Sequence, residues 1–268
     1  MSRIAVTAFS GWNDAGEAAS GTIEHLLTAW PSHAVGAVDA EEYVDFQVNR
    51  PSISTEPDGR RILTWPDTEL RLLRAPSGDE LVTVLGPEPS LRWKRYCDEV
   101  LEQLQELGVD RVISLGALLA DVPHSRDLPV SMIAESHPDD LVRDVDLYEG
   151  PVGVPTVLAC RLASAGVDTT SIWVQVPHYI SQHPSPKAVL ALVRALQIEV
   201  PWQLPIGSLV EDAAEWERNV NELASTDEDV ADYVERLEQA QDATRMPEAS
   251  GDAIAAAFER FLRDRRSE

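Results

Sequence analysis

The sequence contains little lysine and cysteine, and it lacks any long apolar run. Only two cysteines are present, Cys97 and Cys160. Both fall in stretches with helical spacing, and their positions do not form a pattern typical of disulfide-bonded domains. This favours a reducing cytoplasm over a disulfide framework. No stretch approaches ~18 uninterrupted apolar residues, so we expect no membrane-spanning helix. The first residues enter an apolar strand directly, without the apolar region of a signal peptide, and we therefore expect a cytoplasmic protein.

Positive charge is also scarce. Lysine and arginine together number 22, against 46 aspartates and glutamates, and the formal net charge is −24. A chain this acidic repels phosphate backbones, so we expect no binding to nucleic acid or to an anionic membrane surface. Lys94 and Lys187 are the only lysines. They leave few ammonium groups to hold a triphosphate, which disfavours an ATP-dependent ligase.

The usual signatures of phosphate and acyl-transfer sites are missing. There is no glycine-rich dinucleotide motif, no P-loop and no Gly-x-Ser-x-Gly elbow. A metal site is conceivable, since imidazole and carboxylate groups suit several divalent ions. Its ligands would be His124, His178 and His183 with Asp14 or Asp121. No closely spaced histidine pair supports it, and we predict neither a metal nor a cofactor.

Apolar runs separated by amphipathic stretches predict an α/β fold. The central run, residues 111–115, is typical of a strand buried on both faces, and Gly116 is expected to end it. Further strands are predicted at residues 4–9, 34–38, 61–64, 70–75, 81–86, 130–134 and 171–176. Helices are predicted at residues 14–30, 90–107, 155–165 and 186–198. Asp14 and Glu17 resemble a capping box at the start of the first helix.

The composition changes near residues 201–207, where strand signals end and helical spacing begins. We therefore predict a core domain over residues 1–204 and an all-helical region over residues 205–268. Leu209, Ala213, Trp216 and Val220 have the spacing of helix-on-helix packing. A capping-box signature at residues 225–228 predicts the next helix, and a last helix is expected at residues 251–263.

Polar residues follow three of the predicted core strands. Because the carboxyl ends of parallel strands meet at one edge of a sheet, these residues could converge in a crevice. They are Asn13, Asp14, Asp121, His124, Arg126, His178 and Lys187. The loop at Glu149 and Gly150 could supply a further wall. The alternative is structural: Asn13 and Asp14 would cap a helix, and the histidines would bond loop backbone groups.

Four spaced motifs carry a resemblance. They lie at residues 9–16, at 116–124, at 148–151, and at 176–179 with 184–188. Together they resemble the PAC2 family, the proteasome assembly chaperone 2 family, in its bacterial branch. The resemblance implies a three-layer α/β/α core similar to the phosphorylase/hydrolase-like fold, with the helical region as an appendage. It also implies a homo-oligomer, a dimer or a trimer, and eukaryotic and archaeal relatives act as assembly chaperones for proteasome α-subunits.

Two functions remain open, and we favour the first. It is a non-catalytic, oligomeric protein that binds a protein partner in the manner of an assembly chaperone. The second is a small-molecule-binding protein or a phosphorylase- or hydrolase-like enzyme. In that enzyme Asp14 or Asp121 would be the acid or base, His124 and His178 would carry protons, and Arg126 or Lys187 would hold an anion. The candidate ligand-binding residues are Gly11, Trp12, Asn13, Asp14, Gly116, Asp121, His124, Arg126, Glu149, Gly150, His178, Tyr179 and Lys187.

Overall fold

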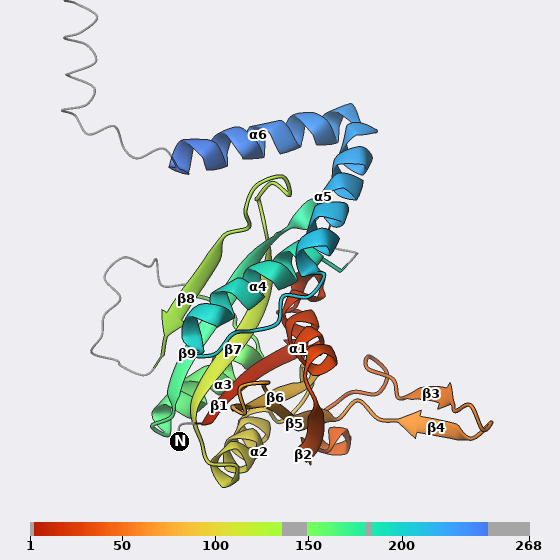
Figure 1. Cartoon of the computed structure of the whole chain (residues 1–268), viewed down its shortest axis with the longest axis vertical. Helices are drawn as coiled ribbons and strands as arrows, with labels where there is room; N and C mark the ends of the chain where they lie inside the picture. Colours follow the sequence, from red (N-terminus) through yellow and green to blue (C-terminus); the bar gives the residue numbers. More distant parts are fainter. Residues whose placement is uncertain (1–2, 136–148, 181–183, 246–268) are drawn as a thin grey trace, which may run out of the picture.

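A seven-stranded sheet forms the centre of the molecule (Figure 1). The computed structural model describes residues 3–135, 149–180 and 184–245. The sheet order is β2-β5-β6-β1-β7-β9-β8. Its strands are β1 (Arg3–Ser10), β2 (Ser32–Val38), β5 (Thr68–Arg74), β6 (Glu80–Pro87), β7 (Val109–Ala120), β8 (Val130–Ala134) and β9 (Asp168–Pro177). A separate hairpin consists of β3 (Ser52–Thr55) and β4 (Arg61–Thr64).

The four central strands run in parallel, and β5 and β8 run against them. β1 lies between β6 and β7, parallel to both, and β9 is parallel to β7. β2, β5 and β8 are each antiparallel to their neighbours. The carboxyl ends of β6, β1, β7 and β9 therefore share one edge of the sheet, which is the arrangement on which the predicted crevice depends.

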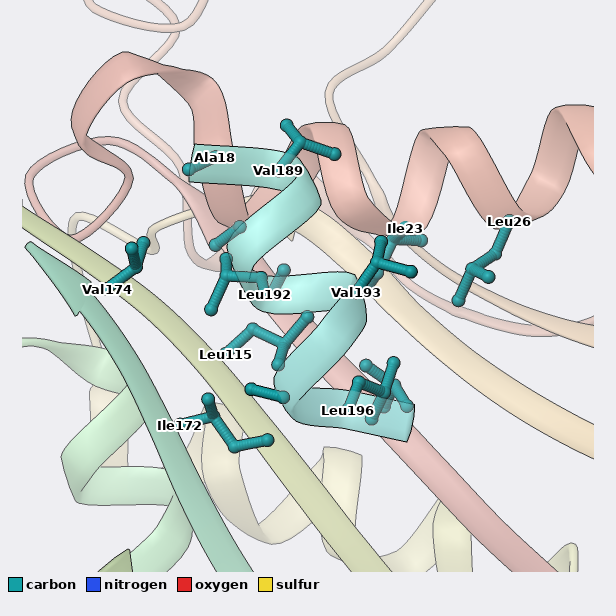
Figure 2. Packing of buried hydrophobic residues seen from close by; sticks show 14 of the residues in the cluster. Ala18, Ile23, Leu26, Leu115, Ile172, Val174, Val189, Leu192, Val193 and Leu196 are labelled. Carbon is teal, nitrogen blue, oxygen red and sulfur yellow. The ribbon is translucent and has the colours of Figure 1, made fainter. Parts of the chain in front are cut away.

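Two helices cover each face of the sheet. α1 (Ala18–Ala29) and α4 (Pro186–Glu199) lie on one face, and α2 (Trp93–Glu106) and α3 (Val154–Ser164) lie on the other. Figure 2 shows Leu192 and Leu196 of α4 packed on Leu115 and Ile172 of the sheet, beside Ile23 of α1. Full burial of one such side chain stabilises the fold by about 1.5–3 kcal/mol. The α/β fold predicted from the sequence patterns, and the α/β/α layering that the family resemblance implies, are confirmed.

Two further helices follow the core. α5 (Leu209–Ser225) packs on α4, and its residues Leu209, Ala213 and Trp216 are buried as their spacing predicted. α6 (Glu228–Arg245) turns away from α5 and crosses above the loop that follows β7 (Figure 1). We call α5 and α6 together the arm. The helix predicted at residues 251–263 lies outside the described residues.

Two local predictions at the strand ends were wrong. The first helix begins at Ala18 rather than near residue 14, because Gly16 and Glu17 both adopt positive φ, of 61° and 51°, which a continuous α-helix excludes. Gly116 does not end its strand. β7 continues to Ala120, and Gly116 is required because a Cβ there would lie 2.4 Å from the ring of Trp173 on β9.

No helix in the described part of the chain is both long enough and apolar enough to cross a membrane.

Candidate functional site

The carboxylate of Asp14 holds the start of α1. Its Oδ1 accepts hydrogen bonds from the backbone N–H groups of Ala19, at 2.7 Å, and Ser20, at 3.1 Å. The hydroxyl of Ser20 donates to Oδ2 at 2.5 Å. Burial raises the pKa of Asp14, and the bonds from Ser20 and Ala19 oppose that rise. Asp14 therefore caps a helix, as the structural alternative stated, although it caps residues five and six positions later.

Asn13 belongs to a cluster that joins β1, β6 and the start of α3. Its Nδ2 donates to Glu88 Oε1 at 3.1 Å, and the backbone N–H of Val154 donates to the same oxygen at 2.8 Å. Glu88 follows β6, and its own N–H donates to the carbonyl of Ser10 at 2.8 Å. Gly153 passes so close that a Cβ would lie 1.7 Å from Asn13 Nδ2. The cluster is thus tightly closed at this point.

Sequence reasoning missed Glu88. The available signal was a carboxylate between two prolines directly after a predicted strand, which is the position where the candidates Asn13 and Asp121 were also found. Glu149 and Gly150 precede Gly153 and are exposed. In the same loop, Gly153 and Val154 are the residues that lie against Asn13 and Glu88.

His124 is completely buried in the loop after β7. Its Nδ1 lies 2.8 Å from the hydroxyl of Tyr179, and that hydroxyl accepts a bond from the His124 backbone N–H at 2.9 Å. Its Nε2 lies 3.1 Å from Oδ1 of Asn221 on α5. Because a carbonyl oxygen can only accept, Nε2 carries the hydrogen, and Nδ1 accepts from Tyr179. Burial lowers the pKa of His124, which keeps the ring neutral.

Tyr179 also belongs to a group of four rings. His124, His178, Tyr179 and Tyr233 meet edge to face, with centroids 5.7–6.0 Å apart. Burial raises the pKa of Tyr179 to about 12. Tyr233 comes from α6, so this group connects the end of β9 to the arm.

Asp121 and His178 meet at the rim of the same region. Nδ1 of His178 lies 3.2 Å from Asp121 Oδ1, and the hydroxyl of Tyr233 donates to that oxygen at 3.1 Å. Asp121 is largely exposed, with 80 % of its side-chain surface accessible. The predicted convergence therefore holds for Asp121 and His178, whereas the side chain of Asn13 bonds Glu88 at the end of another strand pair.

The two basic candidates bind carboxylates of the arm. Arg126 makes a bidentate contact with Asp242, with Nε–Oδ1 at 3.0 Å and Nη2–Oδ2 at 2.9 Å. Lys187 donates to the carbonyl of His124 at 2.5 Å and to Glu217 of α5. We call Asp121, His124, Arg126, His178, Tyr179 and Lys187 the arm socket, because each contacts α5, α6 or another member that does.

The remaining candidates lie elsewhere. Gly11 and Trp12 stand on the rim of an open cavity beside β6 and α1, and Trp12 is 69 % exposed. Gly116 is buried within β7. Among the described residues, no group of three or more histidine, cysteine, aspartate or glutamate side chains is placed to hold a metal ion. His183 lies outside them.

The molecule is an α/β protein. Its mixed seven-stranded sheet lies between helical layers, and a helical arm docks on the strand ends. The PAC2 family model matches residues 8–224, and the chain belongs to the PAC2 family. The match covers both strand-end clusters and all but the last residue of α5, and it ends before α6. The family resemblance seen in the sequence motifs is thereby confirmed.

Solved structures agree with this assignment. A PAC2 family protein from Streptomyces avermitilis is 44% identical, covers 87% of this chain and 99% of its own, and has a TM-score of 0.78. A proteasome-assembly chaperone homologue from Mycobacterium tuberculosis is 39% identical, covers 86% and 99%, and has a TM-score of 0.77. An archaeal proteasome activator from Pyrococcus furiosus, 15% identical over 82% and 93%, shares the fold with a TM-score of 0.65. No curated protein matches the chain.

Proposed function

We propose that this chain is a non-catalytic, cytoplasmic, oligomeric protein that binds a protein partner in the manner of an assembly chaperone. The observation that carries the proposal is the arm socket. A catalytic crevice would need the polar groups of its candidate residues free. Instead, the side chains of three of them bind residues of the arm: His124 binds Asn221, Arg126 binds Asp242, and Lys187 binds Glu217. The strand ends thus serve to present two helices, and a presented helical surface is suited to a partner protein.

The arm has the chemistry of a surface for a basic partner. Residues 209–245 contain twelve aspartates and glutamates and three arginines. On α6, Glu228, Asp229, Asp232 and Glu235 are all exposed. Such a surface attracts a positively charged partner over distances of about a Debye length, and it repels other acidic surfaces.

The relatives suggest which partner to test first. The Mycobacterium tuberculosis relative is described as a homologue of a proteasome-assembly chaperone. Proteasome subunits are therefore the first candidates for this chain.

The experiment measures binding of the full chain to immobilised, purified proteasome α-subunits. We expect saturable binding, and we expect the Asp232→Lys/Glu235→Lys variant to weaken it at least about tenfold, because opposite charges become like charges. The matched control is Glu102→Lys/Glu106→Lys on α2, where both side chains are exposed on the other face of the core. Absence of saturable binding by the unaltered chain, or equal losses in both variants, would overturn the proposal.

The alternative of an enzyme at the strand ends has less support. Both carboxylate oxygens of Asp14 and both ring nitrogens of His124 have bonded partners within the fold. A general acid or base has to reach a substrate atom at hydrogen-bonding distance. The Asp232→Lys/Glu235→Lys variant also distinguishes the two functions. The activity of an enzyme at the strand ends would not depend on charges of α6 that lie outside the arm socket.

A further inference from the structure

The sheet has a topological switch point between β1 and β6. These neighbouring strands are parallel, and the chain leaves them toward opposite faces of the sheet: α1 follows β1 on one face, and α2 follows β6 on the other. In open α/β sheets a crevice forms outside the carboxyl ends of two strands that part in this way, and ligands bind there. The fold therefore places a ligand crevice at β1 and β6, whereas the arm socket lies at the ends of β7 and β9.

A cavity of about 860 Å³ opens at this switch point. Ser10 and Trp12 line it from the end of β1, and Glu88 and Ser90 line it from the end of β6. It continues over β5 and β6 beside α1. Pockets for small molecules have volumes of roughly 300–1,000 Å³. The topology and the size of the cavity thus both indicate a small ligand.

The wall of the cavity is acidic. One arginine, Arg71, lines it, and Glu69 pairs with that arginine at 3.3 Å. The acidic residues of the lining are Asp14, Glu17, Glu24, Asp67, Glu69 and Glu88. Glu17 and Glu24 are exposed, and they take part in none of the ion pairs of the described residues. The other four bind groups of the fold itself, so these two carboxylates are left for a ligand.

A buried hydroxyl in the lining has no partner. Thr83 of β6 lines the cavity and is only 1% exposed, and its Oγ1 has no hydrogen-bond partner among the described residues. A buried hydroxyl without a partner costs free energy until a donor or acceptor reaches it. Its oxygen can accept a hydrogen bond from an ammonium group, which carries only donors. This observation is independent of the acidic wall, and it indicates the same kind of ligand.

The separation of the two carboxylates favours an extended organic cation over a metal ion. Glu17 directly precedes α1 and Glu24 lies within it, about two helical turns further on, which is roughly 10 Å along a helix. In the described part of the chain, no three histidine, cysteine, aspartate or glutamate side chains are placed to hold a metal ion. Two positive groups joined by a spacer fit such a pair of carboxylates better than one compact charge.

The rest of the lining fits an aliphatic spacer. Its apolar side chains include Leu27 of α1, Leu85 of β6 and Val48. On the rim, Trp12 is 69% exposed, and an indole face attracts organic cations. Apolar contact and negative charge are therefore combined in one cavity, as a chain of methylene groups between ammonium groups requires.

We propose that the cavity binds a linear aliphatic polyamine. Two of its ammonium groups pair with Glu17 and Glu24, an ammonium hydrogen bonds to Thr83, and the methylene groups lie against the apolar lining. The ligand site is independent of the partner proposed for the arm, because no residue of α5 or α6 lines the cavity.

The test is calorimetric titration of spermidine into the full chain, and we expect saturable binding of one molecule per chain. Glu17→Gln/Glu24→Gln should weaken binding at least about tenfold, because both opposite charges are removed. Thr83→Val keeps the shape of the side chain and removes only the hydroxyl, so it should weaken binding about threefold or more. The fold should not lose stability in this variant, since the hydroxyl has no partner within it.

Controls are needed because a chain of net charge −24 attracts any polycation. Glu102→Gln/Glu106→Gln on α2 makes the same change of charge on the other face of the core, where both side chains are exposed, and should leave the dissociation constant unchanged. Magnesium chloride should compete with spermidine no better than sodium chloride of equal ionic strength. Binding without saturation, cavity variants that bind like the unaltered chain, equal losses in the two glutamine variants, or preferential displacement by magnesium would each overturn the inference.

Discussion

The hydroxyl of Tyr179 bonds His124 twice, accepting from its backbone N–H at 2.9 Å and donating to its Nδ1 at 2.8 Å. One side chain at the end of β9 thereby fixes both the loop after β7 and the tautomer of its histidine. The other ring nitrogen is left to donate to Asn221 of the arm. One of the contacts that hold the arm on the strand ends therefore runs through the ring of His124.

Loss of the Tyr179 hydroxyl should destabilise the fold. Tyr179→Phe leaves the buried N–H and Nδ1 of His124 without partners, and we expect the free energy of unfolding to fall by about 1–3 kcal/mol. Urea denaturation measures the change. Tyr233→Phe is the control, because its hydroxyl bonds the largely exposed Asp121 and should contribute less than about 1 kcal/mol. Equal losses of unfolding free energy in the two variants would show that the two hydrogen bonds from Tyr179 to His124 contribute no more than the single exposed one of Tyr233.

Stability should depend on pH through His124. Burial holds its pKa below 6.5, so the folded state binds this proton less readily than the unfolded state. Its contribution is complete above pH 6.5 and is lost as the pH falls toward the lowered pKa. The difference in unfolding free energy between the unaltered chain and His124→Gln should shrink from pH 7 to pH 5, by at most about 1.4 kcal/mol per pH unit.

A difference that stays constant over that range would contradict the assignment of a buried neutral ring. Subtracting the variant removes the contribution of the other histidines and of the many carboxylates, which titrate in both proteins.

The bidentate contact between Arg126 and Asp242 should control local opening of α6. Both side chains are partly exposed, so Arg126→Ala should change global stability by less than about 1 kcal/mol. Amide hydrogen exchange in α6 should nevertheless accelerate, because arm docking is a local equilibrium. Arg161→Ala on α3 is the control, since Arg161 pairs with Asp98 at similar exposure on the opposite face. Equal exchange in α6 for both variants would contradict the prediction.

Gly153 should tolerate no side chain. A Cβ there would lie 1.7 Å from Asn13 Nδ2 and 2.6 Å from Glu88 Oε1, so Gly153→Ala should destabilise the fold by about 1–3 kcal/mol through overpacking. Because the clash is with Asn13, the double variant with Asn13→Ala should lose less than the sum of the two single losses. Thermal and urea unfolding of all four proteins test this, and strict additivity would show that Asn13 is not the obstacle.

Features set by neighbouring residues were predictable from the sequence. Every strand except β3 and the four core helices were predicted from hydrophobic periodicity, and α5 was found from the spacing of Leu209, Ala213 and Trp216. β3 was missed because the residues before and within it show no clear alternation. The order of strands in the sheet and the course of α6 depend on contacts between distant segments, and periodicity carries no information on those.

The local errors have physical causes of the same kind. Asp14 was expected to be the N-cap of a helix that begins directly beside it, but two left-handed residues, Gly16 and Glu17, displace the helix start to Ala18. Gly116 was interpreted as a strand end. In the structure, glycine is needed there because a side chain would clash with Trp173, which is 57 positions later in the chain. A glycine that ends a strand in a turn and a glycine that makes room for a neighbouring side chain look the same in a sequence. Only the fold distinguishes the two roles.

The candidate site was predictable as a set of residues rather than as a mechanism. The strand-end rule correctly placed Asp121 beside His178, and it missed Glu88, which binds Asn13. Nothing in the local sequence announces that Asn221 and Asp242 would meet His124 and Arg126. The ligand-binding role of these residues and the boundary near residue 204 remain predictions.

The arm contacts span long stretches of chain: His124 and Asn221 are 97 positions apart, and Arg126 and Asp242 are 116. During synthesis the sheet can therefore be complete while the polar residues at the ends of β7 and β9 are still exposed to water. A nascent chain of this protein passes through a stage in which its histidine-bearing loop is open to solvent and to other proteins, and α5 and α6 close it when they leave the ribosome later.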